Sequence, residues 1–131
     1  MGLTQTAELR FPADPDLVML ARMVSAAAAS RAGFGLEQVE DLRLAVNELC
    51  LSLIGPGPAD GMLQVTFAWG QDAVEVAVSN HRQQGAPSIH AAMSSSPERE
   101  LSTRILETLV DEYGLEDASG TARAWLRVRR A

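Results

Sequence analysis

The chain has 131 residues, of which 47% are hydrophobic and 21% charged, and its formal net charge is -6. These proportions are typical of one folded domain and exclude a disordered chain, so we expect a single domain over residues 1–131. The negative charge argues against nucleic acid as the main partner, because a phosphate backbone is bound by an excess of Lys and Arg.

The residue types that are missing exclude further classes of protein. All 11 basic residues are Arg, so no mechanism based on a P-loop lysine or a Schiff-base lysine is available. Cys50 is the only cysteine, which excludes an internal disulfide and favours a buried core thiol. No stretch approaches the roughly 20 apolar residues of a membrane span, and the first residues lack a signal-peptide pattern. We therefore expect a cytoplasmic protein with no membrane partner.

The first part of the chain predicts a strand and two helices. Residues 6–11 form the strand, and Asp14-Pro15 is typical of a helix N-cap followed by proline at the first helical position. The first helix has its apolar residues at Leu17, Leu20, Ala21, Val24 and Ala28, and Gly33 ends it. The second helix extends from about Leu36 to Ile54, with an apolar stripe at Val39, Leu42, Val46, Leu49 and Leu53.

A hairpin and a long loop follow. The strands 62–69 and 73–80 alternate apolar and polar residues around a turn at 70–72, and Asn80 continues the inward positions of its strand. Residues 79–97 contain few large apolar side chains. Long structureless loops are uncommon in compact domains and often serve as functional lids, so we predict that residues 81–96 are mobile without a partner.

The last part predicts a third helix and a second hairpin. Ser96-Pro97 opens the helix and Gly114 ends it; its expected buried face is Leu101, Ile105, Leu109 and Tyr113. Strands 115–118 and 121–129 follow. The second of them is expected to direct Ala122, Ala124, Leu126 and Val128 inward and Arg123, Trp125, Arg127 and Arg129 outward. This order predicts an α+β fold, a two-layer sandwich with a mixed, mostly antiparallel sheet and three helices on one face.

Two places on these elements could support chemistry. Glu48 and Ser52 are four residues apart on the second helix, so they are neighbours beside the apolar stripe. A carboxylate next to a hydroxyl suits a general base beside a metal or phosphate contact, but a solvated helix boundary has the same spacing. Asn80 points toward the core and needs a partner, which could be a ligand or the loop that it would cap.

The stretch 39–50, VEDLRLAVNELC, resembles the N-box helix of the bacterial anti-sigma-factor serine kinases. These proteins belong to the GHKL superfamily, which has the Bergerat or histidine kinase-like ATPase fold. Leu109-Val110-Asp111-Glu112, and later Gly120-Thr121 with a final strand, resemble the end of that family's domain. The order of elements agrees over residues 7–130.

The resemblance assigns roles to single residues. It implies that Glu48 is the catalytic base toward a substrate serine. Ser52 stands where the family has an asparagine that binds magnesium, and Asn80 where it has an aspartate that accepts the adenine amino group. Thr121 matches the threonine beside the nucleotide. Ser52, Asn80 and Thr121 are therefore the expected nucleotide-binding positions, and no metal site made by the protein alone is expected.

Several of these positions depart from the family pattern. His81-Arg82-Gln83-Gln84 replaces the first glycine-rich motif, and Glu100 and Ser102 stand at the glycines of the second. Glu100 would bring negative charge to a helix N-terminus that should attract a triphosphate. Ser52 is a weak magnesium ligand, although Asn80 keeps a carbonyl acceptor. We expect no bound cofactor and little kinase activity, with ATP and magnesium bound only if the site is functional.

The resemblance favours an anti-sigma factor that sequesters a sigma factor in a stress or developmental partner-switching pathway. An anti-sigma-factor antagonist protein would release the sigma factor. The alternatives are an active ATP-dependent serine kinase that phosphorylates the antagonist, and a binding module of the same fold unrelated to transcription. The resemblance also implies a homodimer, for which Trp125 and the Arg-bearing last strand are candidate contacts.

Overall fold

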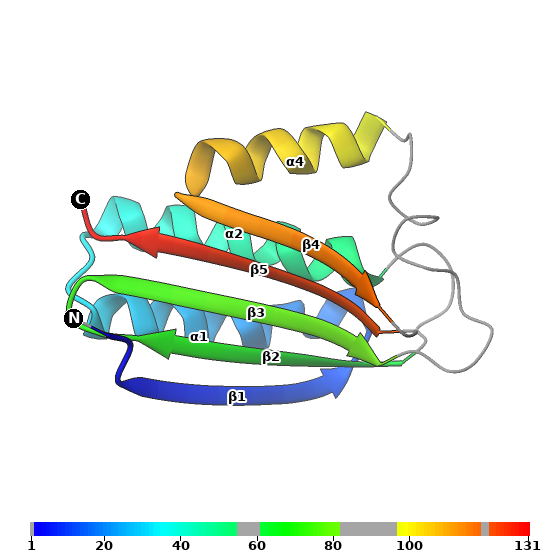
Figure 1. The fold of residues 1–131 in the computed structure, drawn as a ribbon, viewed down its shortest axis with the longest axis horizontal. Helices are drawn as coiled ribbons and strands as arrows, with labels where there is room; N and C mark the ends of the chain where they lie inside the picture. The colour runs from blue at the N-terminus through cyan, green and yellow to red at the C-terminus, as the bar shows by residue number, and fades with distance from the viewer. Residues whose placement is uncertain (1, 55–60, 82–96, 119–120) are drawn as a thin grey trace.

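The protein, described here from a computed structural model, is an open five-stranded sheet with helices on one face (Figure 1). The structure describes residues 2–54, 61–81, 97–118 and 121–131. The sheet order is β1-β2-β3-β5-β4, and each neighbouring pair is antiparallel. The strands are β1 (Gln5–Pro12), β2 (Met62–Trp69), β3 (Ala73–His81), β4 (Glu112–Ala118) and β5 (Thr121–Arg129). The predicted two-layer α+β sandwich is confirmed, and the described strands form a purely antiparallel sheet.

Helix α1 (Val18–Arg31) follows a short 3-10 turn, Pro15–Leu17. Asp14 caps this turn, as its carboxylate accepts a 2.9 Å hydrogen bond from the Asp16 amide. At the other end, Gly33 has a φ of 82°, a left-handed conformation that favours glycine. Both predicted ends of the helix are therefore close to the observed ones.

The buried face of α1 differs from the expected stripe. Leu20 is exposed, together with Met19 and Met23, and the residues that face the core are Val18, Ala21, Ser25, Ala28 and Ala29. Ten of the 14 residues of α1 are apolar, so a period of 3.6 residues fits more than one of its faces. The prediction for Leu20 was wrong for this reason.

Helix α2 (Leu36–Ile54) lies in the centre of the helical layer, between α1 and α4 and behind β3 and β5 (Figure 1). Its predicted stripe is buried without exception at Val39, Leu42, Val46, Leu49 and Leu53. These side chains form one core with the inward residues of the sheet, which include Leu63, Val65, Phe67, Val76, Val78 and Leu126. None of the helices in the described parts of the chain is long and apolar enough to cross a membrane.

Helix α4 (Pro97–Leu109) begins where the sequence predicts but ends earlier. Val110 still donates to the Leu106 carbonyl, whereas the Asp111 amide donates to Arg127 of β5. The chain therefore enters β4 at Glu112, and Tyr113 and Gly114, which we expected in the helix and at its end, belong to the strand.

The expected buried face of α4 was wrong in part as well. Leu101 is exposed and Ile105 and Leu109 are half-buried, whereas Leu106 is buried in the core. Because Tyr113 continues the helical spacing of Ile105 and Leu109, the sequence pattern did not show where the helix stops. The loop predicted to be mobile at 81–96 lies outside the described residues, apart from His81, which ends β3.

Candidate functional site

The last turns of α2 position Glu48 and Ser52. Glu48 is half-buried, and Ser52, one turn later, is buried. The Ser52 hydroxyl donates a 2.7 Å hydrogen bond to the backbone carbonyl of Glu48. This bond from a hydroxyl to the carbonyl four residues earlier is a common arrangement for serine within a helix. Ser52, at the expected magnesium position, thus makes a hydrogen bond to the backbone of its own helix.

Asn80 lies at the end of β3 on the helix-covered face of the sheet and is fully buried. Its Nδ2 donates a 2.6 Å hydrogen bond to the backbone carbonyl of Leu53 in the last turn of α2. Its Oδ1 is buried and has no hydrogen-bond partner among the residues that the structure describes. The sequence left open whether Asn80 meets a ligand or the loop; the structure shows a third arrangement, in which the amide contacts α2.

Thr121 lies on the other face of the sheet. It is paired with His81 at the start of β5, whereas Asn80 is paired with Ala122. Thr121, His81 and Arg123 line an open hollow of about 460 Å³ on the face that the helices do not cover. The structure therefore gathers Glu48, Ser52 and Asn80 around the end of α2 and leaves Thr121 apart from them.

The site suits the base of an adenine nucleotide and its metal ion to different degrees. The Oδ1 of Asn80, which no described residue contacts through a hydrogen bond, is a buried acceptor that suits an amino group such as that of adenine. For the metal, the described residues contain no group of three or more His, Cys, Asp or Glu side chains that could hold an ion. At the expected magnesium position the Ser52 hydroxyl donates to the Glu48 carbonyl, and a hydroxyl is a weaker magnesium ligand than a carboxylate or amide oxygen. The residues present therefore fit the base of a nucleotide better than its magnesium. Of the run His81-Arg82-Gln83-Gln84, expected at the first glycine-rich motif, His81 ends β3 and the other three residues lie outside the described part of the chain. Glu100 and Ser102 lie within α4.

Cys50 is buried in the core on the same helix. Burial raises the pKa of its thiol to about 12, and the positive charge of Arg22 opposes only part of that rise. A protonated thiol is a poor nucleophile, so the predicted core role is confirmed. Arg22 of α1 donates a 2.6 Å hydrogen bond to Asn47 Oδ1 and so joins the two helices beside the site, a contact that no local sequence pattern indicates.

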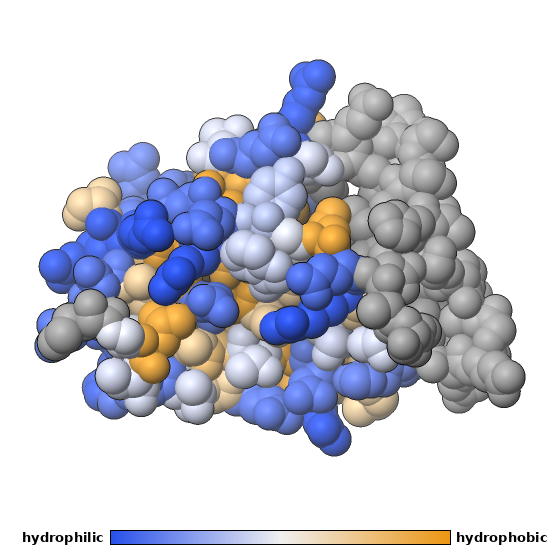
Figure 2. Space-filling view, in the orientation of Figure 1, coloured by the Kyte–Doolittle hydropathy of each residue, from blue (hydrophilic) through white to orange (hydrophobic). Residues whose placement is uncertain are grey.

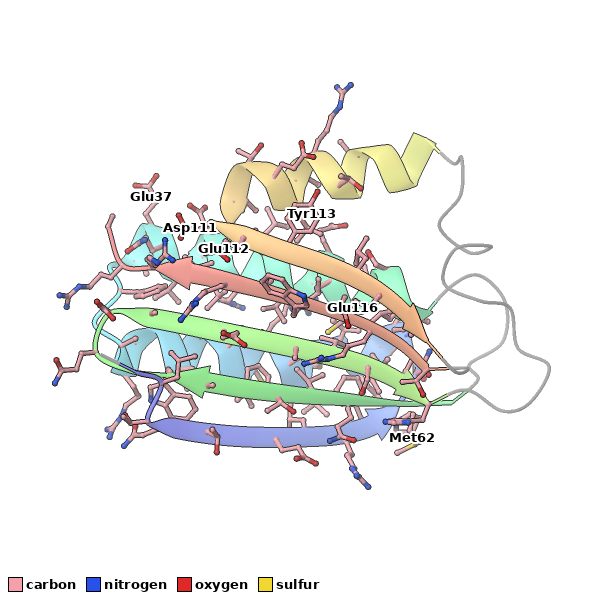
Figure 3. The ribbon with its side chains drawn as sticks, viewed as in Figure 1. Glu37, Met62, Asp111, Glu112, Tyr113 and Glu116 are labelled. Carbon is pink, nitrogen blue, oxygen red and sulfur yellow. The ribbon has the colours of Figure 1, made fainter. Side chains whose placement is uncertain are left out.

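Acidic residues near the end of α4 form a second polar group (Figure 3). The Asp111 carboxylate accepts from the Arg129 amide at 2.7 Å, and Glu112 lies 3.1 Å from the Arg129 guanidinium. The Tyr113 hydroxyl donates to Glu107; burial, this bond and the nearby negative charge raise the pKa of Tyr113. These contacts fasten α4 and β4 to β5 and have a structural role.

The sequence profile of the histidine kinase-like ATPase domain family matches residues 11–130. The chain therefore belongs to that family, and the resemblance that its sequence indicated is confirmed.

Within the family, the chain is similar to serine-protein kinases RsbW. It is 29% identical to the one from Bacillus velezensis and 28% to the one from Bacillus subtilis, each over 130 residues, 89% of this chain and 81% of the relative. The fold is similar to a crystal structure of RsbU and RsbW domains from Mycobacterium tuberculosis. That likeness has a TM-score of 0.65 at 17% identity and covers 96% of this chain and 32% of the other.

Proposed function

We propose that the chain is an anti-sigma factor of the RsbW type that acts as one cytoplasmic domain. It binds a sigma factor, keeps it from transcription, and releases it to an antagonist protein in a partner-switching pathway. The family membership and the similarity to serine-protein kinases RsbW over most of both chains support this proposal.

We also propose that ATP binding is weak or lost. This proposal is carried by the hydrogen bonds that two side chains make to the backbone of α2. Asn80 donates to the carbonyl of Leu53, and Ser52 donates to the carbonyl of Glu48. At these positions the resemblance expects contacts to adenine and to magnesium. A lost hydrogen bond to a charged group costs about 1.5–3 kcal/mol, which is roughly ten- to a hundredfold in affinity.

The second candidate is an active kinase that phosphorylates a serine of the antagonist. Two features favour it: Glu48 occupies the position of the base at the edge of the core, and Asn80 Oδ1 still offers an acceptor. In this case ATP and magnesium are required, and Thr121 contacts the nucleotide only if β5 changes its position relative to β3, because Thr121 is on the open face.

Titration calorimetry with Mg-ATP distinguishes the two candidates. We expect no dissociation constant tighter than about 1 mM, which corresponds to roughly 4 kcal/mol of binding free energy, and no phosphate transfer to an antagonist. A micromolar constant, together with phosphorylation that Glu48→Ala abolishes, would establish the kinase instead. Glu37→Ala, an exposed glutamate at the other end of α2, is the matched control and should change neither result.

The partners are tested by co-purification with the sigma factors of the host. We expect a stable complex with one of them that an antagonist protein dissociates, and binding to none of them would contradict the anti-sigma function. We further propose a homodimer in which Trp125 and the arginines of β5 lie at the contact. Sedimentation of the wild type and of Trp125→Ala tests this, and a monomeric wild type would rule it out.

A further inference from the structure

The end of α2 is held by a side chain from a different element. A side chain from another element that donates to a carbonyl in the last turn of a helix holds that end of the helix against the element. Leu53 lies in this last turn, and its carbonyl accepts from Asn80 Nδ2 at 2.6 Å. Asn80 is 27 residues further along the chain, at the end of β3, so this bond joins the helical layer to the sheet.

The chemistry of the contact fixes which way the amide points. The oxygen and nitrogen of an asparagine side chain are assigned from their partners, and a backbone carbonyl can only accept. The amide nitrogen of Asn80 must therefore face Leu53, and position 80 requires a hydrogen-bond donor. A carboxylate there would bring a second acceptor and a buried negative charge against the carbonyl.

A second side chain makes a hydrogen bond to the backbone near the end of α2. The buried Ser52 hydroxyl donates to the Glu48 carbonyl at 2.7 Å. The part of α2 that carries Glu48 is thus fastened by donors that belong to the protein itself, one of them from β3. Because the Asn80 contact is buried and the Ser52 contact is partly buried, solvent competes weakly with them.

We propose that Asn80 is a positioning residue that caps α2 and ties it to β3, so that the partner-binding form of the protein is assembled without a nucleotide. The second half of this statement rests on the proposed anti-sigma function. The first half concerns only the fold and is tested without any partner. The two halves can therefore fail separately.

The chain offers a matched pair of variants for the cap. In Asn80→Asp the required donor becomes an acceptor, whereas in Asn47→Asp the bond is kept, because Asn47 Oδ1 accepts from Arg22. Urea unfolding at pH 7 should show an unfolding equilibrium constant raised at least tenfold for Asn80→Asp and changed less than about threefold for Asn47→Asp. Amide exchange of residues 51–54 should accelerate in the first variant and not in the second. Equal stability of the two variants would overturn the cap.

The pH dependence separates a donor requirement from simple loss of packing. A protonated carboxyl group can donate to the Leu53 carbonyl, and burial raises its pKa above that in the unfolded chain. The deficit of Asn80→Asp is therefore largest above the folded pKa and shrinks as the pH falls toward about 4, the unfolded value for aspartate. If Asn80→Asp is too unstable to purify, Asn80→Ala gives the same comparison without a charge, and its deficit should not depend on pH. A deficit of Asn80→Asp that is independent of pH would overturn the donor requirement.

The nucleotide-independent half is tested by the affinity for the sigma factor with and without Mg-ATP. We expect less than a twofold difference for the wild type. A tenfold or larger difference would overturn this half and leave the cap to be decided by stability.

Asn80→Asp should gain no ATP binding; a variant that binds Mg-ATP and is as stable as the wild type would show that position 80 recognises a ligand and does not cap α2. If no sigma factor binds, the proposed function fails, and the stability measurements still decide the cap.

Discussion

Polar side chains are rare and bonded to backbone on the helix-covered face of the sheet, whereas they form exposed ion pairs on the open face. On the helix-covered face, β5 presents buried Ala122, Ala124, Leu126 and Val128. The one buried polar residue that β3 adds to this face is Asn80, which bonds to the backbone of α2. On the open face, arginines of β5 lie beside carboxylates of the neighbouring strands, as in Arg127–Glu75 at 3.9 Å and Arg129–Glu112 at 3.1 Å. Figure 2 shows this open face as mostly hydrophilic, with smaller hydrophobic areas between the charged residues.

The difference shows where a family's functional residues can change without loss of the fold. A polar group in water can be exchanged for another at little cost, because solvent replaces a lost partner. A buried polar group must keep a hydrogen-bond partner of the right kind. Position 80 is of the second type, so a polar residue there needs a contact within the protein, and the Asn80 amide nitrogen has one with the Leu53 carbonyl.

The largest expected difference between the faces is at neighbouring positions of β5. Leu126→Ala removes a fully buried side chain from the core and should lower the free energy of unfolding by about 2–5 kcal/mol. Arg123→Ala, on the open face with its side chain 53% exposed, should cost less than about 1 kcal/mol. Urea unfolding of both variants checks this, and losses of similar size would show that the open face is covered in solution.

An intermediate effect is expected on the open face, where Trp125 crosses the backbone of β4. A Cβ atom at Gly114 would lie 2.5 Å from Trp125 Nε1, so the indole ring must move. Gly114→Ala should therefore lower the free energy of unfolding by about 1–3 kcal/mol, as in other overpacked sites. In a Trp125→Ala background the same substitution should be nearly neutral, which a double-mutant cycle measures.

The control for this prediction is Gly2→Ala, because no atom lies within 4 Å of a Cβ at Gly2. It should leave the unfolding midpoint unchanged. If Gly114→Ala is equally harmless, the ring of Trp125 does not rest on Gly114 in solution.

The smallest effect is expected for the ion pairs of the open face. Arg129 and Glu112 are 3.1 Å apart, with side chains 61% and 46% exposed. A double-mutant cycle on this pair should give a coupling of about 0.2–1 kcal/mol. The coupling should fall as the salt concentration rises from about 0.05 to 1 M, because added ions screen exposed charges. A coupling that is larger or insensitive to salt would indicate that the pair is shielded from water.

Most of the fold could be predicted from the sequence where one period dominates. In the first half of α2, charged residues such as Glu40, Asp41 and Arg43 stand between the apolar positions. They mark one face for burial, and Val39, Leu42 and Val46 are buried as expected. The alternation in β5 is equally clear. In α1 most residues are apolar, so the sequence pattern did not decide which face of the helix is buried. At the end of α4 the competing signal was tertiary, because the pairing of Glu112 with Arg127 starts a strand inside an apparent helix.

The candidate site could be predicted in part. The spacing of Glu48 and Ser52 placed them on adjacent turns, and the period of β3 placed Asn80 on the inner face. The contact of Asn80 with Leu53 depends on how two distant segments approach, and no local pattern contains that information. For Thr121 a signal was present: it has the same parity in β5 as Arg123, which was expected to face outward, and both line the open face.

The strand order has a consequence for how the protein folds. β3 and β5 pair along their whole lengths, from Ala73 with Arg129 to His81 with Thr121, so the two hairpins β2–β3 and β4–β5 meet edge to edge. Each hairpin closes over a short distance in the chain, whereas their union must close a much longer loop and is entropically slower. The Asn80–Ala122 pair belongs to this late ladder. The surroundings of Asn80 are therefore complete only after the slowest contacts have formed, and a partly folded chain does not display them.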